Sequence, residues 1–363
     1  MDWSNERLDL QLSTDKLPID LIALFKVELP DKLSAEIGTQ GHLKGTFTNP
    51  SYTGKAKANG QYKNQPLAIN LEADGDLQNF QINSLNADLG DAHIEANGDI
   101  NLKQETLDIA IIELRSPSRL ADTFGIDTPA DLIVDINVSK GSIKGSFTKP
   151  SYEADTEING SFHQQALNIQ SHFEGDLTKL QLNHLSLSFS DGELETSGMI
   201  DWKNEQLDLM INAKDISTSL ASIAQANLPN DLSARINTKG QLKGSFSLPY
   251  FTGKASVMGD YQNTHFDMAT SVNSSSDKIE VSNFSADLTF GKSQNNTTLE
   301  KTPDSSIRAK GIYTPSSKSL EGKISLQDLP YDAIKLAGVE LPQSLSGSIN
   351  ADLSISGKLP LPM

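Results

Sequence analysis

The sequence predicts an all-β protein: an elongated, curved antiparallel β-sheet with an apolar groove, built from repeats and carrying one short helix per repeat. Three observations predict this fold. The chain repeats itself at about 100 residues, each copy alternates apolar with polar residues, and glycine-containing turns separate the alternating segments. Alternation places apolar side chains on one face of a strand and polar side chains on the other, as in a half-exposed antiparallel sheet.

The repeat is marked by a block of the form Gly-x-Leu/Ile-x-Gly-x-Phe, found at 41–47, 141–147 and 240–246. A proline follows three residues after each block, and an aromatic residue follows two residues after the proline. We therefore divide one continuous array into repeats at 1–101, 102–201, 202–312 and 313–363. Residues 291–306 form an Asn/Ser/Thr-rich insertion in the third repeat, which is typical of a surface loop. The first repeat starts mid-array and the fourth is truncated, so we expect a section of a longer protein.

The strand after each block shows which face is inside. One face keeps small and aromatic residues in every copy, whereas the other changes from Lys55 and Lys57 to Asp155 and Glu157. A face that accepts either charge lies in water, and mid-strand glycines allow the sheet to bend. We therefore predict that the first face, with its neighbours on other strands, forms an apolar groove. The predicted lining residues are Tyr52, Gly54, Ala56, Ala58, Tyr62, Leu67, Ile69, Ile94, Ile100, Tyr152, Ile158, Phe162, Ile200, Phe251, Ala255, Val257 and Tyr261.

One segment of each repeat loses the alternation. In these segments apolar residues recur at helical spacing, and serine or proline stands near each start, as at a helix N-terminus. We expect short amphipathic helices, laid apolar side down on the sheet, at 18–29, 117–126, 217–228 and 330–339. One such helix for about six strands is too little to cover the apolar face, so part of that face should stay open to a ligand.

Composition argues against several functions. A formal net charge of −17 does not suit binding to nucleic acid, and the absence of cysteine excludes thiolate chemistry. The six histidines do not keep the phase of the repeat, and the sequence contains no catalytic or phosphate-binding motif. We expect neither an enzyme nor a cofactor or metal. Asp-Gly turns at 74–76 and Glu-Gly-Asp at 174–176 leave calcium as a minor alternative, although turns alone explain them.

The block running into Tyr-x-Gly, at 41–54, resembles the TamB family within the AsmA-like group of bacterial envelope proteins. The Gly-x-Ile-x-Trp strand at 198–202 adds to the resemblance, which covers nearly the whole chain. It implies a periplasmic location, with the parent protein anchored in the inner membrane by a segment absent here. It also implies an outer-membrane partner of the Omp85 type, and roles in phospholipid transport and outer-membrane protein assembly.

Together these observations predict that phospholipid acyl chains lie along the apolar face and slide passively between the two membranes. Two alternatives remain open. The sheet could be a platform that accepts strands of outer-membrane proteins by β-augmentation. It could also be a purely structural periplasmic stalk with a closed, dry core.

Overall fold

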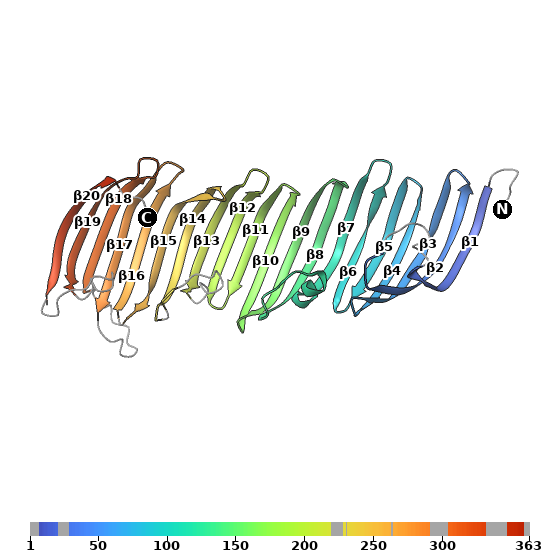
Figure 1. The fold of residues 1–363 in the computed structure, drawn as a ribbon, viewed down its shortest axis with the longest axis horizontal. Helices are drawn as coiled ribbons and strands as arrows, with labels where there is room; N and C mark the ends of the chain where they lie inside the picture. Colours follow the sequence, from blue (N-terminus) through green and yellow to red (C-terminus); the bar gives the residue numbers. More distant parts are fainter. Residues whose placement is uncertain are drawn as a thin grey trace. The chain divides into compact units, whose positions relative to one another are not determined.

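The computed structural model describes residues 7–20, 29–218, 228–229, 231–262, 264–290, 304–331 and 347–358. Within these residues the regular elements are twenty β-strands and one short 3-10 helix, which confirms the predicted all-β class (Figure 1). The chain divides into two compact units, Met1–Ser190 and Asp191–Met363. The division falls inside the second predicted repeat, and the repeat boundaries stay a prediction.

The first unit is an antiparallel meander in which each strand pairs with the next one along the chain. Its strands are β1 (Arg7–Pro18), β2 (Leu33–Thr46), β3 (Pro50–Tyr62), β4 (Gln65–Asp76), β5 (Asn79–Leu89), β6 (Ala92–Asn101), β7 (Thr106–Pro117), β8 (Leu132–Ser146), β9 (Lys149–Phe162), β10 (Gln165–Asp176) and β11 (Lys179–Phe189). Short hairpin connections join most of these antiparallel neighbours, whereas the longer segments 19–32 and 118–131 join β1 to β2 and β7 to β8.

The second unit repeats this arrangement, again with each strand paired to the next. Its strands are β12 (Gly192–Asp201), β13 (Gln206–Ser217), β14 (Ser233–Ser245), β15 (Leu248–Tyr261), β16 (Thr264–Ser274), β17 (Ile279–Phe290), β18 (Ser305–Thr314), β19 (Ser319–Pro330) and β20 (Ser348–Lys358). The strands of each unit bend along their length, as the ribbon shows (Figure 1).

Two kinds of hairpin turn recur. Between β3 and β4, Lys63 and Asn64 both have positive φ (48° and 67°), as a two-residue type I′ turn requires. Between β4 and β5, the carboxylate of Asp76 accepts hydrogen bonds from the backbone N–H groups of Gln78 and Asn79, at 2.7 and 2.8 Å. Asp176 does the same between β10 and β11. These turns explain the Asp-Gly segments without a bound ion.

A β-bulge recurs in phase with the repeat. In β5, Ser84 pairs with Glu72 and Ile82 pairs with Ala73, so Asn83 has no residue opposite it. The same two-against-one arrangement occurs at Asn183 in β11 and at Ser282 in β17. A bulge inserts one residue and bends its strand. It also shifts the alternation by one, so that apolar residues on both sides of the bulge stay on the same face.

Glycines mark places where neighbouring strands come close together. A Cβ on Gly60 would lie 1.9 Å from the carbonyl oxygen of Ser34 on β2. The equivalent Gly160 and Gly259 would place a Cβ 2.0 and 2.2 Å from carbonyl oxygens on β8 and β14. The repeat keeps glycine at these positions because any side chain would push the adjacent strand away.

A second pair of glycines is covered by an aromatic ring. Gly41 and Gly54 stand opposite each other on β2 and β3, and the ring of Tyr52 lies where either Cβ would be. The third copy repeats this arrangement with Phe251 over Gly240 and Gly253. Covering paired glycines with a ring replaces the packing that the missing side chains would supply.

The second copy shows how the ring depends on the glycine. There the partner of Gly141 is Ala154 instead of glycine. Tyr152 does not lie over this pair; it packs edge-on against Phe173 on β10, with the ring centroids 6.2 Å apart. The methyl group of Ala154, where the other copies have glycine, therefore occurs together with a different position of the aromatic ring.

The expected helices are confirmed only in part. At 117–126 the structure has the 3-10 helix η2 (Ser118–Phe124), which lies beside β7 and β8. Leu120 and Ala121 of η2 are half-buried, whereas Phe124 is 55% exposed and its ring centroid lies 6.4 Å from that of Tyr62 at the end of β3. The lysine Lys63 donates to the carbonyl of Thr123 at 2.6 Å, so polar bonds help to hold η2. Most of 18–29, 217–228, 291–306 and 330–339 lies outside the described residues.

The glycine contacts predict which glycines resist substitution. We expect Gly60→Ala to lower the free energy of unfolding by about 1–3 kcal/mol, the usual cost of overpacking. Gly357→Ala is the matched control, because a Cβ there has nothing within 4 Å. Chemical denaturation of both variants measures the difference. Equal stability of the two would mean that β2 and β3 are not held so closely.

The turn carboxylates predict a pH dependence. The pKa of Asp176 is lowered by hydrogen bonds from the side chain and backbone of Thr178 and from the backbone of Lys179. A lowered pKa in the folded state stabilises the fold above the unfolded value of about 3.9. That contribution is lost as the pH falls through the folded pKa. We therefore expect Asp176→Ala to be destabilising at neutral pH and to match the wild type in strong acid. A stability difference that did not change with pH would contradict this.

Candidate functional site

The site is an uncharged strip on one face of each unit, formed by rows of residues that pair across successive strands. In the first unit three adjacent rows run from β1 to β11. The first row is Leu17, Ile37, Ala58, Ile69, Ala87, Ile94, Leu114, Val138, Thr156, Ser171 and Leu185. The second is Thr14, Thr39, Ala56, Leu71, Leu85, Ala96, Ile111, Gly141, Ala154, Phe173 and Leu182. The third is Leu12, Gly41, Gly54, Ala73, Ile82, Gly98, Ile109, Ile143, Tyr152, Gly175 and Leu180. We call these rows the first apolar strip.

The threonine and serine hydroxyl groups of the first apolar strip have hydrogen-bond partners. Thr156 and Ser171, which pair across β9 and β10, hydrogen-bond to each other. Thr39 donates to the carbonyl of Lys55 at 3.2 Å, and its backbone N–H donates to the hydroxyl of Thr14 at 3.2 Å. A hydroxyl that already has a partner loses little when an apolar molecule displaces water from it.

The second unit carries an equivalent strip. Two rows run from β12 to β20 and one from β13 to β20. They are Leu194, Ala213, Thr238, Ala255, Thr270, Phe284, Ala309, Ile324 and Leu353; then Thr196, Ile211, Gly240, Gly253, Val272, Val281, Gly311, Gly322 and Ile355; and Ile216, Ile236, Val257, Met268, Ala286, Ile307, Leu326 and Ala351. We call these rows the second apolar strip. Neither strip contains a charged residue.

The opposite face of both units carries the charges. Lys55 pairs with Glu72 at 2.9 Å, and Lys144 and Lys243 each lie 3.3 Å from an aspartate on the preceding strand. Exposed pairs of this kind add little stability, about 0–1 kcal/mol each. The side chains of these three pairs are 40–64% exposed, so this face is in contact with water.

The strips themselves are not covered by a second layer of the described chain. Leu17 in the first strip is 40% exposed, and Leu353 in the second is 47% exposed. Among the described residues, six of the eleven buried apolar residues are alanines. The other five are Val134, Leu182, Phe189, Phe266 and Leu329, and Leu182 belongs to the first apolar strip. An exposed apolar surface of this extent marks a binding site in a soluble protein.

All the residues predicted to line the groove lie on the face of these strips, and each is half-buried. Several belong to the rows above, for example Ala58, Ile69 and Ala255. Others flank them on the same face, as Tyr62 and Ile200 do. The structure brings them onto one face within each unit; their contact with lipid stays a prediction.

Sequence reasoning missed part of the strips. Leu85 and Ala87 on β5 were not predicted, although Ala87 pairs with both Ile69 and Ile94. The bulge at Asn83 shifts the alternation by one residue in mid-strand, so a regular two-residue pattern assigns one half of β5 to the wrong face. A one-residue shift at the same phase of each repeat is the signal that could have shown these residues.

Where the titratable residues of the described ranges pair, they mostly do so singly. Within the described ranges no cluster of three or more histidine, aspartate or glutamate side chains could hold a metal ion. Five histidines each have a ring nitrogen within contact distance of an aspartate carboxylate. These pairs are His42–Asp9, His93–Asp88, His163–Asp131, His172–Asp155 and His265–Asp260. In the described part of the chain, no helix is long and apolar enough to cross a membrane.

The two faces can be separated by chemical labelling, because the wild-type chain has no cysteine. We expect Lys57→Cys, on the polar face of β3, to react quickly with a water-soluble maleimide. Ala58→Cys is the adjacent residue on the first apolar strip and should react more slowly. An apolar maleimide should reverse the preference. Equal rates for both variants with both reagents would contradict the assignment of faces.

Comparison with known proteins places the chain in a family. The model of the TamB N-terminal domain matches residues 126–309, from just before β8 into β18. No curated protein and no solved structure matches the chain. The matched region is about half of the chain and includes repeated blocks, bulges and parts of both apolar strips. The chain therefore belongs to the TamB family.

Proposed function

We propose that this chain is a periplasmic section of a bridge-like lipid transport protein. Phospholipid acyl chains lie along the apolar strips and slide passively between the inner and outer membranes. Membership of the TamB family supports the setting: a parent protein anchored in the inner membrane, with an outer-membrane partner of the Omp85 type. The detailed support comes from the strips.

One observation carries the proposal. The rows of uncharged residues run across the strands and pass through every strand from β1 to β11 in the first unit. A molecule moving along a row crosses one strand about every 4.8 Å. Along the first two rows it meets only apolar side chains, glycine, or hydroxyl groups that already have a hydrogen-bond partner. The direction of the rows is thus the direction in which lipid can travel without meeting a charge.

The energetics favour sliding over tight binding. Each buried CH2 group of an acyl chain gains about 0.8 kcal/mol on leaving water. Since neighbouring positions along a row are chemically similar, this gain is nearly the same at each of them. The free energy along the row is then almost level, and no single position traps the lipid. Headgroups remain in water beside the strip, so this mechanism selects weakly among lipids.

The alternatives fit the strips less well. β-Augmentation of client strands uses the backbone groups of a sheet edge, and an uncharged row across the middle of the sheet adds nothing to it. A structural stalk with a dry core needs a second layer over its apolar face. The described residues supply no such layer over Leu17 or Leu353, which remain 40% and 47% exposed.

The proposal is tested by a charge placed on the strip. Ala58 lies between Ile37 and Ile69 in the first row, and Asn59 is its neighbour on the polar face. We expect Ala58→Arg to reduce the phospholipid that co-purifies with the protein, because an unpaired charge must draw water into the strip. Asn59→Arg stands opposite Glu36 and should leave co-purified lipid unchanged. Mass spectrometry of gently isolated protein measures the lipid, and circular dichroism checks folding.

Two results would contradict the proposal. Wild-type protein that carries no phospholipid would favour the structural stalk. A folded Ala58→Arg protein with the same lipid content as the Asn59→Arg control would mean that lipid does not lie on this face.

A further inference from the structure

A patch on the polar face of the second unit has lysines and no carboxylate. It covers three consecutive polar-face positions on each of β13, β14, β15 and β16. These are Met210, Asn212 and Lys214; Asn237, Lys239 and Gln241; Thr252, Lys254 and Ser256; and Ala269, Ser271 and Asn273. The chain as a whole has 47 acidic and 30 basic residues, so a patch whose charged residues are all basic is unusual for this chain.

Two of these lysines face each other directly. Lys239 on β14 pairs with Lys254 on β15, and like charges in this position destabilise a sheet. The equivalent positions in the earlier repeats are balanced. Lys55 forms an ion pair with Glu72 at 2.9 Å, and Lys140 stands opposite Asp155. Of the three repeats compared, only the third has two lysines opposite each other at these positions.

Three of the carboxylates that border the patch have partners other than its lysines. Glu195 on β12 accepts a hydrogen bond from Asn212 at 3.0 Å, and Asp208 accepts one from Gln241 at 2.6 Å. Glu280 on β17 pairs with Lys278 at 2.8 Å. Glu193 stands opposite Lys214 across β12 and β13. Within the described chain, no carboxylate forms an ion pair with Lys214, Lys239 or Lys254.

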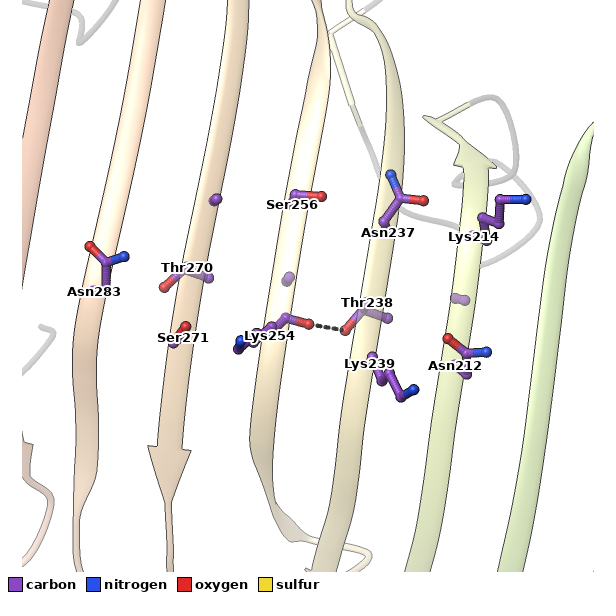
Figure 2. A pocket seen from close by; sticks show the side chains of 13 residues that line it. Asn212, Lys214, Asn237, Thr238, Lys239, Lys254, Ser256, Thr270, Ser271 and Asn283 are labelled. Atoms are coloured by element: carbon purple, nitrogen blue, oxygen red, sulfur yellow. Dashed lines mark hydrogen bonds between the residues drawn. The ribbon is translucent and has the colours of Figure 1, made fainter.

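The patch is also hollowed. A shallow hollow of about 500 Å³ is lined by residues 212–214 of β13, 237–239 of β14, 254–256 of β15 and 269–271 of β16, together with Asn283 of β17. These runs include Ala213, Thr238, Ala255 and Thr270, whose side chains belong to the second apolar strip. Figure 2 shows the side chains of Lys239 and Lys254 directed to opposite sides, away from each other. This arrangement is the one that repulsion between two ammonium groups favours. The space between them is bordered by amide and hydroxyl groups that can donate hydrogen bonds.

We propose that this hollow binds a phosphate group, held by Lys239 and Lys254 and by the amide donors of Asn212 and Asn237. Lysine binds phosphate as a point charge, and an oxyanion between the two ammonium groups replaces their repulsion with attraction. The group is inorganic phosphate or the phosphate of an anionic lipid headgroup, which present the same oxygens. Lys239 and Lys254 alternate with Thr238 and Ala255 of the second apolar strip and so lie on the opposite face. A site built on these two lysines does not depend on the proposed transport of acyl chains.

Isothermal titration calorimetry of the full chain with inorganic phosphate, at constant ionic strength, tests the site. We expect saturable binding that the double variant Lys239→Gln/Lys254→Gln weakens by at least about tenfold. Sedimentation with phosphatidylcholine vesicles, with and without phosphatidic acid, identifies the source. Extra binding that depends on phosphatidic acid and is lost in the double variant assigns the site to a headgroup. Binding of inorganic phosphate alone assigns it to free phosphate.

A second lysine pair supplies the matched control. Lys310 and Lys323 also stand opposite each other, but Glu321 and Glu280 line the hollow beside them. We expect Lys310→Gln/Lys323→Gln to bind phosphate as the wild type does. Equal losses in both double variants would show a general charge effect and overturn the proposal. So would the absence of saturable binding by the wild type.

The repulsion gives a second readout. In phosphate-free buffer, Lys239→Gln/Lys254→Gln should melt at a higher temperature than the wild type, because it removes two opposed charges. Added phosphate should raise the melting temperature of the wild type and leave that of the double variant unchanged. A double variant that melts below the wild type without phosphate would show that the lysines stabilise the sheet, which contradicts a site kept for binding.

Discussion

The structure depends on one constraint: every strand of a unit must turn its apolar residues to the same face. In a meander with a two-residue period, one extra residue in one strand would send the rest of that strand to the wrong side. The chain contains such extra residues at Asn83, Asn183 and Ser282. Because the sequence after each bulge is itself shifted by one, Leu85 and Ile82 still share a face. The bulges therefore bend the strands without breaking the apolar rows.

This constraint explains which parts of the fold could be predicted. The strand from Tyr52 to Tyr62 alternates without a bulge, and its faces follow from the sequence alone. The faces of Leu85 and Ala87 do not follow from the alternation within β5, because the shift at Asn83 is defined by the pairing of β5 with β4. The helical spacing at 117–126 predicted a helix, and the structure has the 3-10 helix η2 there. The spacing alone could not show that Phe124 would remain exposed. Lys63 in the β3–β4 turn bonds to Thr123 of η2, and a contact between residues so far apart in the chain does not follow from the local sequence.

The role of the mid-strand glycines also could not be predicted fully from the sequence. Their presence in mid-strand indicates a special backbone, but the sequence does not say whether they leave room for a ligand or for the protein itself. At Gly60 a neighbouring strand occupies the space, and at Gly41 and Gly54 a tyrosine ring does. The apolar face is thus a packed surface and not a set of empty spaces. A ligand on it lies over the side chains, which suits a molecule that slides more than one held in a pocket.

The two faces also differ in how freely they vary between repeats. On the apolar face a change such as Gly54 to Ala154 is accommodated locally, by a different position of the tyrosine, and the row stays uncharged. On the polar face the charge itself changes, because water or a cross-strand partner can balance either sign. Individual repeats can therefore acquire separate properties on that face while the apolar rows stay continuous within each unit. The unbalanced lysines opposite each other on β14 and β15 are such a local property, and they leave the uncharged row through Thr238 and Ala255 intact.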